Sequence, residues 1–88
     1  MSAPCGLAIL GSTGSIGRST LQVVALHPER FRVAVLGAHR SWQAMVEQAR
    51  VFHPERVVLV DPEAAAQARA ALRACGSRVP VESGAQAL

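Results

Sequence analysis

Residues 7–20, LAILGSTGSIGRST, decide the fold of this chain. Four consecutive apolar residues lead into Gly11, glycine recurs at positions 14 and 17, and an apolar pattern with helical spacing begins at Leu21. This order predicts a buried strand, a glycine-rich turn and a helix. Glycine in such a turn permits positive φ, close approach of a ligand to the backbone and close packing of the helix against the strand. The unpaired amides and the positive dipole end of the helix then favour a bound phosphate.

Strand and helix patterns alternate along the rest of the chain. A first helix is predicted over residues 15–26, because Pro28 cannot continue the helical hydrogen-bond ladder. A second strand is predicted over residues 31–37, FRVAVLG, and its near-continuous apolar character favours a sheet covered on both faces. The residues of the first helix that are expected to face the sheet are Ile16, Leu21, Val24 and Ala25.

A second helix is predicted between Ser41, which can cap it, and the pair His53-Pro54, which closes it. Its apolar residues recur at i, i+3, i+4 and i+7, the spacing of one buried stripe. These residues, which we assign to the core, are Trp42, Met45, Val46 and Ala49.

A third strand over residues 56–60 is followed by Asp61-Pro62-Glu63, a helix start with a capping carboxylate and a proline in the first turn. The third helix is expected to end at Gly76 in a left-handed cap. A short fourth strand is predicted over residues 79–81, and residues 83–88 resemble the beginning of another helix. The residues expected on the buried face of the third helix are Ala65, Ala68, Leu72 and Cys75.

The resulting order, β-α-β-α-β-α-β, predicts an α/β fold in which right-handed crossovers build a parallel sheet. We interpret residues 1–88 as the N-terminal part of a Rossmann-like, doubly wound domain. Because the pattern stops within a predicted helix, we expect the chain to be a fragment of a larger protein.

Composition argues against several classes of partner. The formal net charge is +3, and all nine basic residues are arginines scattered along the chain without a basic run, which argues against nucleic-acid binding. No apolar run approaches the ~20 residues of a membrane span, and the N-terminus lacks the pattern of a secretory signal. Cys5 and Cys75 are far apart and lack zinc-ligand spacing, so we expect reduced thiols and a cytoplasmic location.

The spacing of the glycines discriminates between two kinds of phosphate loop. A mononucleotide P-loop requires GxxxxGK[ST], but the corresponding segment, STGSIGRS, has serine in place of the first glycine and arginine in place of the lysine. The GxxGxxG spacing that begins at Gly11 lies within a β-α-β unit of about 30 residues, which favours a dinucleotide.

The segment after the second strand predicts the choice of dinucleotide. NAD-specific sites commonly place an acid there for the ribose hydroxyls, whereas NADP-specific sites supply a cation for the 2′-phosphate. No acid occurs between Glu29 and Glu47, and Arg40 is therefore our candidate for the 2′-phosphate and the adenine. Ser41 and the adjacent helix N-terminus add donors. His39 either lies near the adenine or is simply a polar residue at the strand end.

We find no candidate metal site in the sequence. His27 and His53 each precede a proline at a helix end and share no ligand spacing with a carboxylate or a thiol. Asp61 and Glu63 are explained as residues that start a helix.

Several motifs together resemble a known family. The segments AILGSTGSIGRSTLQVV, HPERFRV, LGAHRSW and EQARVFHPERVVLVD are similar to the NADPH-binding domain of 1-deoxy-D-xylulose 5-phosphate reductoisomerases. The resemblance runs over residues 7–88, and GSTGSIG followed by STL is specific to that family. The resemblance places pyrophosphate contacts on Thr13, Gly14, Ser15 and Ile16, and adenosine phosphate contacts on His39, Arg40 and Ser41. The family often has asparagine at the position of Ser41.

The resemblance also implies the chemistry of a whole enzyme. That enzyme rearranges the sugar phosphate substrate and reduces the resulting aldehyde with NADPH, uses Mg²⁺ or Mn²⁺, forms a homodimer and serves isoprenoid biosynthesis. Its acidic metal ligands, substrate phosphate site and lid lie beyond residue 88, so we expect the 88-residue chain alone to be inactive.

Two alternatives stay open. One is another NADP-linked oxidoreductase, such as a semialdehyde dehydrogenase, which would carry a catalytic cysteine downstream. The other is a nucleotide-sensing module without an acidic metal cluster.

Overall fold

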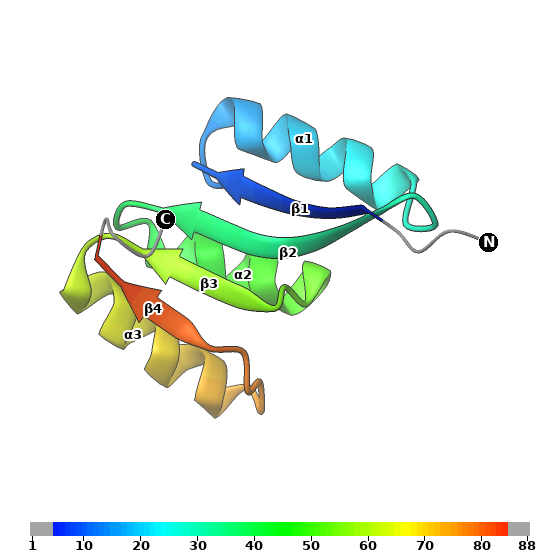
Figure 1. Ribbon diagram of the computed structural model, residues 1–88. Coiled ribbons are helices and arrows are strands. Elements are labelled where there is room, and N and C mark those ends of the chain that lie inside the picture. Colours follow the sequence, from blue (N-terminus) through cyan, green and yellow to red (C-terminus); the bar gives the residue numbers. More distant parts are fainter. Residues whose placement is uncertain (1–4, 85–88) are drawn as a thin grey trace.

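The computed structural model describes residues 5–84, which form a four-stranded parallel sheet with a helix in each connection (Figure 1). The strands lie in the order β1-β2-β3-β4, so each strand pairs with its neighbours in sequence. This confirms the predicted α/β fold with parallel strands. The elements are β1 (Cys5–Leu10), α1 (Ser15–Leu26), β2 (Phe31–Ala38), α2 (Trp42–Phe52), β3 (Arg56–Leu59), α3 (Pro62–Ala74) and β4 (Val81–Ser83).

The hydrophobic core lies on one face of the sheet, and all three helices cover that face. Residues of all four strands join buried residues of every helix in a single cluster, whereas the fully buried Val58, between the cluster members Val57 and Leu59, points to the other face. The strand residues of the cluster are Ile9, Val33, Leu36, Ala38, Val57, Leu59 and Val81. The helix residues are Leu21, Val24, Met45, Val46, Ala49, Ala64, Ala65, Ala68 and Leu72.

The sequence predicts that both faces of the sheet are covered, but within residues 5–84 all helices lie over one face, although Val58 on the second face is fully buried. Successive right-handed crossovers that move in one direction across a sheet place their helices on the same side. Helices over the second face would require the strand order to reverse, and residues 5–84 contain no reversal. Leu10, with 60% of its surface exposed, consequently faces outward at the end of β1.

The helix boundaries follow the capping signals. The Asp61 carboxylate accepts a hydrogen bond from the Ala64 amide at 3.2 Å, and Pro62 occupies the first turn of α3, as predicted. The same helix ends at Ala74, two residues before Gly76, whose φ of +81° confirms the expected left-handed glycine after the helix. Among helices formed by residues 5–84, none is long and apolar enough to cross a membrane.

Three predictions about side chains that face the sheet are wrong. Ile16 is 83% exposed, and Ala25 and Cys75 are also exposed. Ile16 lies in the first turn of α1, where the buried Gly17 makes the contact with the turn instead. Cys75 caps the end of α3 and lies outside its regular turns.

The fourth strand is displaced by two residues from its predicted position. Val81, rather than Val79, pairs with Val57 at the start of β4. Pro80 accepts a hydrogen bond from the Val57 amide at 2.9 Å, but it has no amide of its own to donate. Ser83, expected to begin another helix, ends β4, and the remainder of that predicted helix, residues 85–88, lies outside the described residues.

Candidate functional site

The predicted site residues lie at the carboxyl edge of the sheet. Leu10 at the end of β1 pairs with Gly37 of the neighbouring β2, so the segments that follow these two strands leave the same edge (Figure 1). Residues 11–14 connect β1 to α1, and residues 39–41 connect β2 to α2. Ligands of open parallel sheets bind at this edge.

The glycine turn depends on glycine at positions with different requirements. Gly11 adopts φ +71°, a left-handed conformation that glycine takes without strain. Gly14 precedes α1, and its amide donates to the Gly11 carbonyl at 2.9 Å. At Gly17 a Cβ atom would collide with the Gly11 carbonyl oxygen and lie 2.6 Å from the Ser12 Cα. The first turn of α1 therefore packs directly against the backbone of the glycine turn.

Ser12 fixes this turn to the rest of the fold. Its amide donates to the Gly37 carbonyl at 2.9 Å, and its carbonyl accepts a hydrogen bond from Gln48 Nε2 at 2.8 Å. Its hydroxyl is fully buried and lies 3.9 Å from the Met45 sulfur. The turn is thus held by β2 on one side and by α2 on the other.

Sequence reasoning missed both Ser12 and Gln48. The available signal was the position of Gln48 on α2, three residues after the buried Met45 and next to the buried Ala49. A polar side chain on a buried helix face is expected to find a hydrogen-bond partner. Its Nε2 does so, whereas Gln48 Oε1 is buried without a partner among residues 5–84.

A cavity of about 490 Å³ opens where β1, the glycine turn and the start of α1 meet. The first amides of α1 have no intrahelical acceptor, because the ladder begins with the Arg18 amide donating to the Gly14 carbonyl at 2.9 Å. These free donors and the helix dipole suit an anion. The cavity is lined by Ala8, Ile9, Leu10, Gly11, Gly14, Ser15, Ile16, Gly17 and Thr20.

The second predicted segment has a fixed backbone and exposed side chains. The His39 carbonyl accepts a hydrogen bond from the Asp61 amide at 2.9 Å, and the Arg40 carbonyl accepts one from the Trp42 amide at 2.8 Å. The side chains of His39, Arg40 and Ser41 are exposed. A basic side chain therefore stands at the carboxyl end of β2.

The capping role predicted for Ser41 is only half correct. Ser41 occupies the position before α2, and its carbonyl accepts the Met45 amide at 3.1 Å, but its side chain makes no capping hydrogen bond. Its ψ of 66° departs from the extended backbone that an N-cap residue commonly adopts. The Ser41 hydroxyl is therefore not engaged by its own helix.

The structure brings four of the eight predicted residues to one cavity: Gly11, Gly14, Ser15 and Ile16 line it, whereas Thr13 is half-buried beside it. The residues after β2 stand at the neighbouring strand end and do not line the cavity. Residues 5–84 contain no group of three or more His, Cys, Asp or Glu side chains that could hold a metal ion. The arrangement can bind and orient an anionic ligand, and it supplies no acid or base at the glycine turn.

Parallel strands alternating with helices, together with a glycine turn after the first strand, place the chain in the class of Rossmann-like α/β domains. The family model for 1-deoxy-D-xylulose 5-phosphate reductoisomerase matches residues 7–88. The chain belongs to this reductoisomerase family.

Individual relatives agree with that match. Reductoisomerases of this name from Burkholderia mallei and Burkholderia pseudomallei are 56% identical to the chain over 82 residues, which is 93% of the chain and 21% of each relative. The solved reductoisomerase from Zymomonas mobilis in complex with NADPH is 36% identical, with a TM-score of 0.88 over 99% of this chain and 22% of that one.

A solved reductoisomerase in complex with magnesium is 33% identical to the chain, with a TM-score of 0.90 over 97% of this chain and 21% of that one. The chain thus spans about a fifth of the length of the relatives that it matches.

Proposed function

We propose that this chain is the NADPH-binding part of an oxidoreductase that rearranges and reduces 1-deoxy-D-xylulose 5-phosphate to 2-C-methyl-D-erythritol 4-phosphate in isoprenoid biosynthesis. One observation carries the proposal. Because Gly17 has no side chain, the start of α1 packs directly on the glycine turn, with its free amides beside the cavity. The Zymomonas mobilis relative, solved in complex with NADPH, supports the choice of dinucleotide.

The glycine turn fits the pyrophosphate of a dinucleotide. Gly14 lines the cavity without a side chain, and a Cβ there would lie 3.3 Å from the Gly11 carbonyl oxygen. The amides of Ser15 and Ile16, in the first turn of α1, are placed to donate to the phosphate oxygens. Gly11 and Thr13 complete the predicted contacts with this group.

The segment after β2 fits the adenosine 2′-phosphate. Arg40 offers a planar guanidinium that can pair with the phosphate or stack on the adenine. The Ser41 hydroxyl makes no capping bond and is therefore available to donate, and His39 contributes an exposed ring at the same strand end. Selection of NADPH over NADH is thus assigned mainly to the charge of Arg40.

When bound, NADPH supplies the hydride of the reduction. This chain's own residues orient that cofactor: the turn holds its phosphates, and Arg40 holds its adenosine end. Residues 5–84 contain no cluster of metal-ligating side chains for the Mg²⁺ or Mn²⁺ of the reaction. We therefore assign metal binding, the substrate phosphate site and a closing lid to the part of the protein that the relatives have and this chain does not span.

The experiment that tests this function uses the full-length protein that carries the chain. Oxidation of NADPH is followed by absorbance with 1-deoxy-D-xylulose 5-phosphate and Mg²⁺ or Mn²⁺ present, and the product is identified by mass spectrometry. Formation of 2-C-methyl-D-erythritol 4-phosphate supports the proposal. Binding of NADPH without turnover would instead support a nucleotide-sensing module.

The proposal includes a cytoplasmic homodimer. The dimer follows only from what the family resemblance implies, and the free, exposed thiols of Cys5 and Cys75 agree with a reducing compartment. Light scattering of the full-length protein at several concentrations tests the dimer, because a mass equal to one chain would contradict it.

A further inference from the structure

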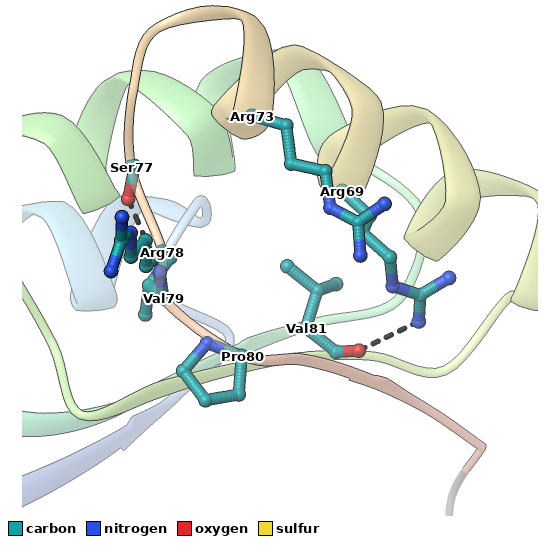
Figure 2. Close-up of a pocket in the computed structure, with 7 residues that line it drawn as sticks. All are labelled: Arg69, Arg73, Ser77, Arg78, Val79, Pro80 and Val81. Atoms are coloured by element: carbon teal, nitrogen blue, oxygen red, sulfur yellow. Dashed lines mark hydrogen bonds between the residues drawn. The ribbon is translucent and has the colours of Figure 1, made fainter.

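A second cavity, of about 460 Å³, lies at the opposite edge of the sheet from the glycine turn. It is formed between the end of α3 and the segment that enters β4 (Figure 1, Figure 2). None of its lining residues lines the cavity beside Gly11. The lining residues are Arg69, Arg73, Ser77, Arg78, Val79, Pro80 and Val81.

The end of α3 builds this cavity by reversing the chain. The Ser77 amide donates to the Leu72 carbonyl at 2.9 Å, and the Gly76 amide donates to the Arg73 carbonyl at 3.0 Å. This pair of bonds, with positive φ at Gly76, is the Schellman motif. The returning segment is held by the Val79 amide, which donates to Ser77 Oγ at 3.3 Å. The turn therefore places Arg78 on the segment that returns opposite α3, and its side chain is directed away from Arg69 and Arg73 (Figure 2).

Three arginines line the cavity, and no carboxylate residue is among the lining residues. Within residues 5–84, the arginines that form ion pairs are Arg32 and Arg56, whereas Arg69, Arg73 and Arg78 form none. Arg69 and Arg73 are spaced i, i+4 on α3, where like charges destabilise a helix. A bound anion would relieve this repulsion.

Arg69 is already oriented for such a ligand. Its Nη2 donates to the Val81 carbonyl at 2.7 Å, which fixes the half-buried side chain against β4 (Figure 2). A guanidinium has five N–H donors, so this bond leaves most of them available. Ser77 adds a hydroxyl whose oxygen already accepts the Val79 amide and whose hydrogen can still be donated.

We propose that this cavity binds a phosphate or diphosphate ester of a small molecule. Arginine side chains match the geometry of phosphate oxygens and bind them through paired hydrogen bonds. The floor formed by Val79, Pro80 and Val81 offers apolar surface to the organic part of the ester. The volume lies within the range of small-molecule sites. The site is separate from the glycine turn and needs no dinucleotide.

Inorganic pyrophosphate is the probe for this site. Its binding to the full-length protein is measured by calorimetry without divalent metal and with NADPH at saturation, so that the glycine turn is not available to the probe. The test variant is Arg73→Gln, and the matched control is Arg50→Gln, because both arginines are exposed and lie in the last turn of their helices. Because both arginines lie in the last turn of a helix, the effect of the helix dipole on the measured affinity is the same in the two variants.

We expect Arg73→Gln to weaken pyrophosphate binding by about tenfold or more, the loss of a charged hydrogen bond, and Arg50→Gln to leave it unchanged. Arg73→Lys should restore part of the affinity, because it keeps the charge and loses the paired geometry. If Arg73→Gln does not fold, Arg78→Gln replaces it.

Two results would overturn the proposal: no heat of binding at millimolar pyrophosphate, or an equal loss in both variants, which would show a general effect of the positive net charge. A failure of NADPH to bind would contradict only the proposed function, since the two sites share no residue.

Discussion

Gln48 Nε2 donates a hydrogen bond to the Ser12 carbonyl oxygen at 2.8 Å, which ties the middle of α2 to the glycine turn after β1. Ser12 has no exposed surface, so its carbonyl cannot exchange this partner for water. The position of the turn therefore depends on a residue that belongs to the next helix and touches no part of the cavity beside Gly11.

Replacement of Gln48 by leucine is expected to weaken NADPH binding. The change leaves the buried Ser12 carbonyl without this donor, a loss of about 1 kcal/mol, which corresponds to about fivefold in Kd. If the turn positions the cofactor as proposed and takes no part in the chemistry, the KM for NADPH should rise while kcat at saturating NADPH stays constant. Gln43→Leu, at an exposed position of the same helix, is the control. A fall in kcat with an unchanged KM would contradict this role.

Gly17→Ala should destabilise the fold. The added methyl group meets backbone atoms of Gly11 and Ser12, which cannot rotate away, so we expect a net loss of about 1–3 kcal/mol in the free energy of unfolding. Gly14→Ala is the milder comparison, because its Cβ would meet one atom, the Gly11 carbonyl oxygen at a tight 3.3 Å, and its φ of −79° suits alanine. Urea unfolding of the two full-length variants measures the difference. Equal midpoints would show that α1 can move away from the turn.

Arg40→Ala should reduce the affinity for NADPH much more than that for NADH. In the proposed site, the variant removes a charged hydrogen-bond donor from the 2′-phosphate, which NADH lacks, and the expected loss is about tenfold for NADPH alone. Titration of the full-length protein by cofactor fluorescence provides both dissociation constants, and Arg50→Ala serves as the control for net charge. An equal loss for the two cofactors would remove Arg40 from the recognition of the phosphate.

Asp61 and Ser41 occupy the same position before their helices and should respond differently to alanine. The Asp61 side chain bonds the Ala64 amide, so Asp61→Ala should cost about 1 kcal/mol of local stability at the start of α3. Ser41 makes no side-chain capping bond, so Ser41→Ala should have little effect on α2. Hydrogen–deuterium exchange of the first turns of both helices tests this pair, and faster exchange in α2 after Ser41→Ala would contradict the geometry.

Local sequence signals predicted most of the fold because they act within a few residues. The boundaries of α1 at Ser15 and Leu26 match the prediction, since the glycine turn and Pro28 act on adjacent residues. The displacement of β4 required knowledge of its partner, because Pro80 can accept a hydrogen bond from β3 but cannot donate one. The exposure of Ile16 likewise depends on how closely Gly17 packs against the turn, and the helical spacing of apolar residues gives no information on that packing.

The glycine turn of the site could be predicted from the sequence, but the hydrogen bonds that hold the turn in place could not. The turn at Gly11 and the basic residue after β2 are both visible in the sequence, because each follows directly from the end of a strand. The bond from Gln48 to Ser12 joins residues 36 positions apart, and only the packing of α2 on the sheet brings them together. The contacts of Thr13, Ser15 and Arg40 with a dinucleotide stay predictions.

The packing of α1 has a consequence for motion. This helix packs against β1 and β2, whereas α2 and α3 also pack extensively against each other. Local opening should therefore begin at α1, and it would dismantle the glycine turn while the rest of the sheet stays folded. A bound dinucleotide would stabilise the closed turn and make this opening rarer. Slower amide exchange in α1 would then report cofactor occupancy.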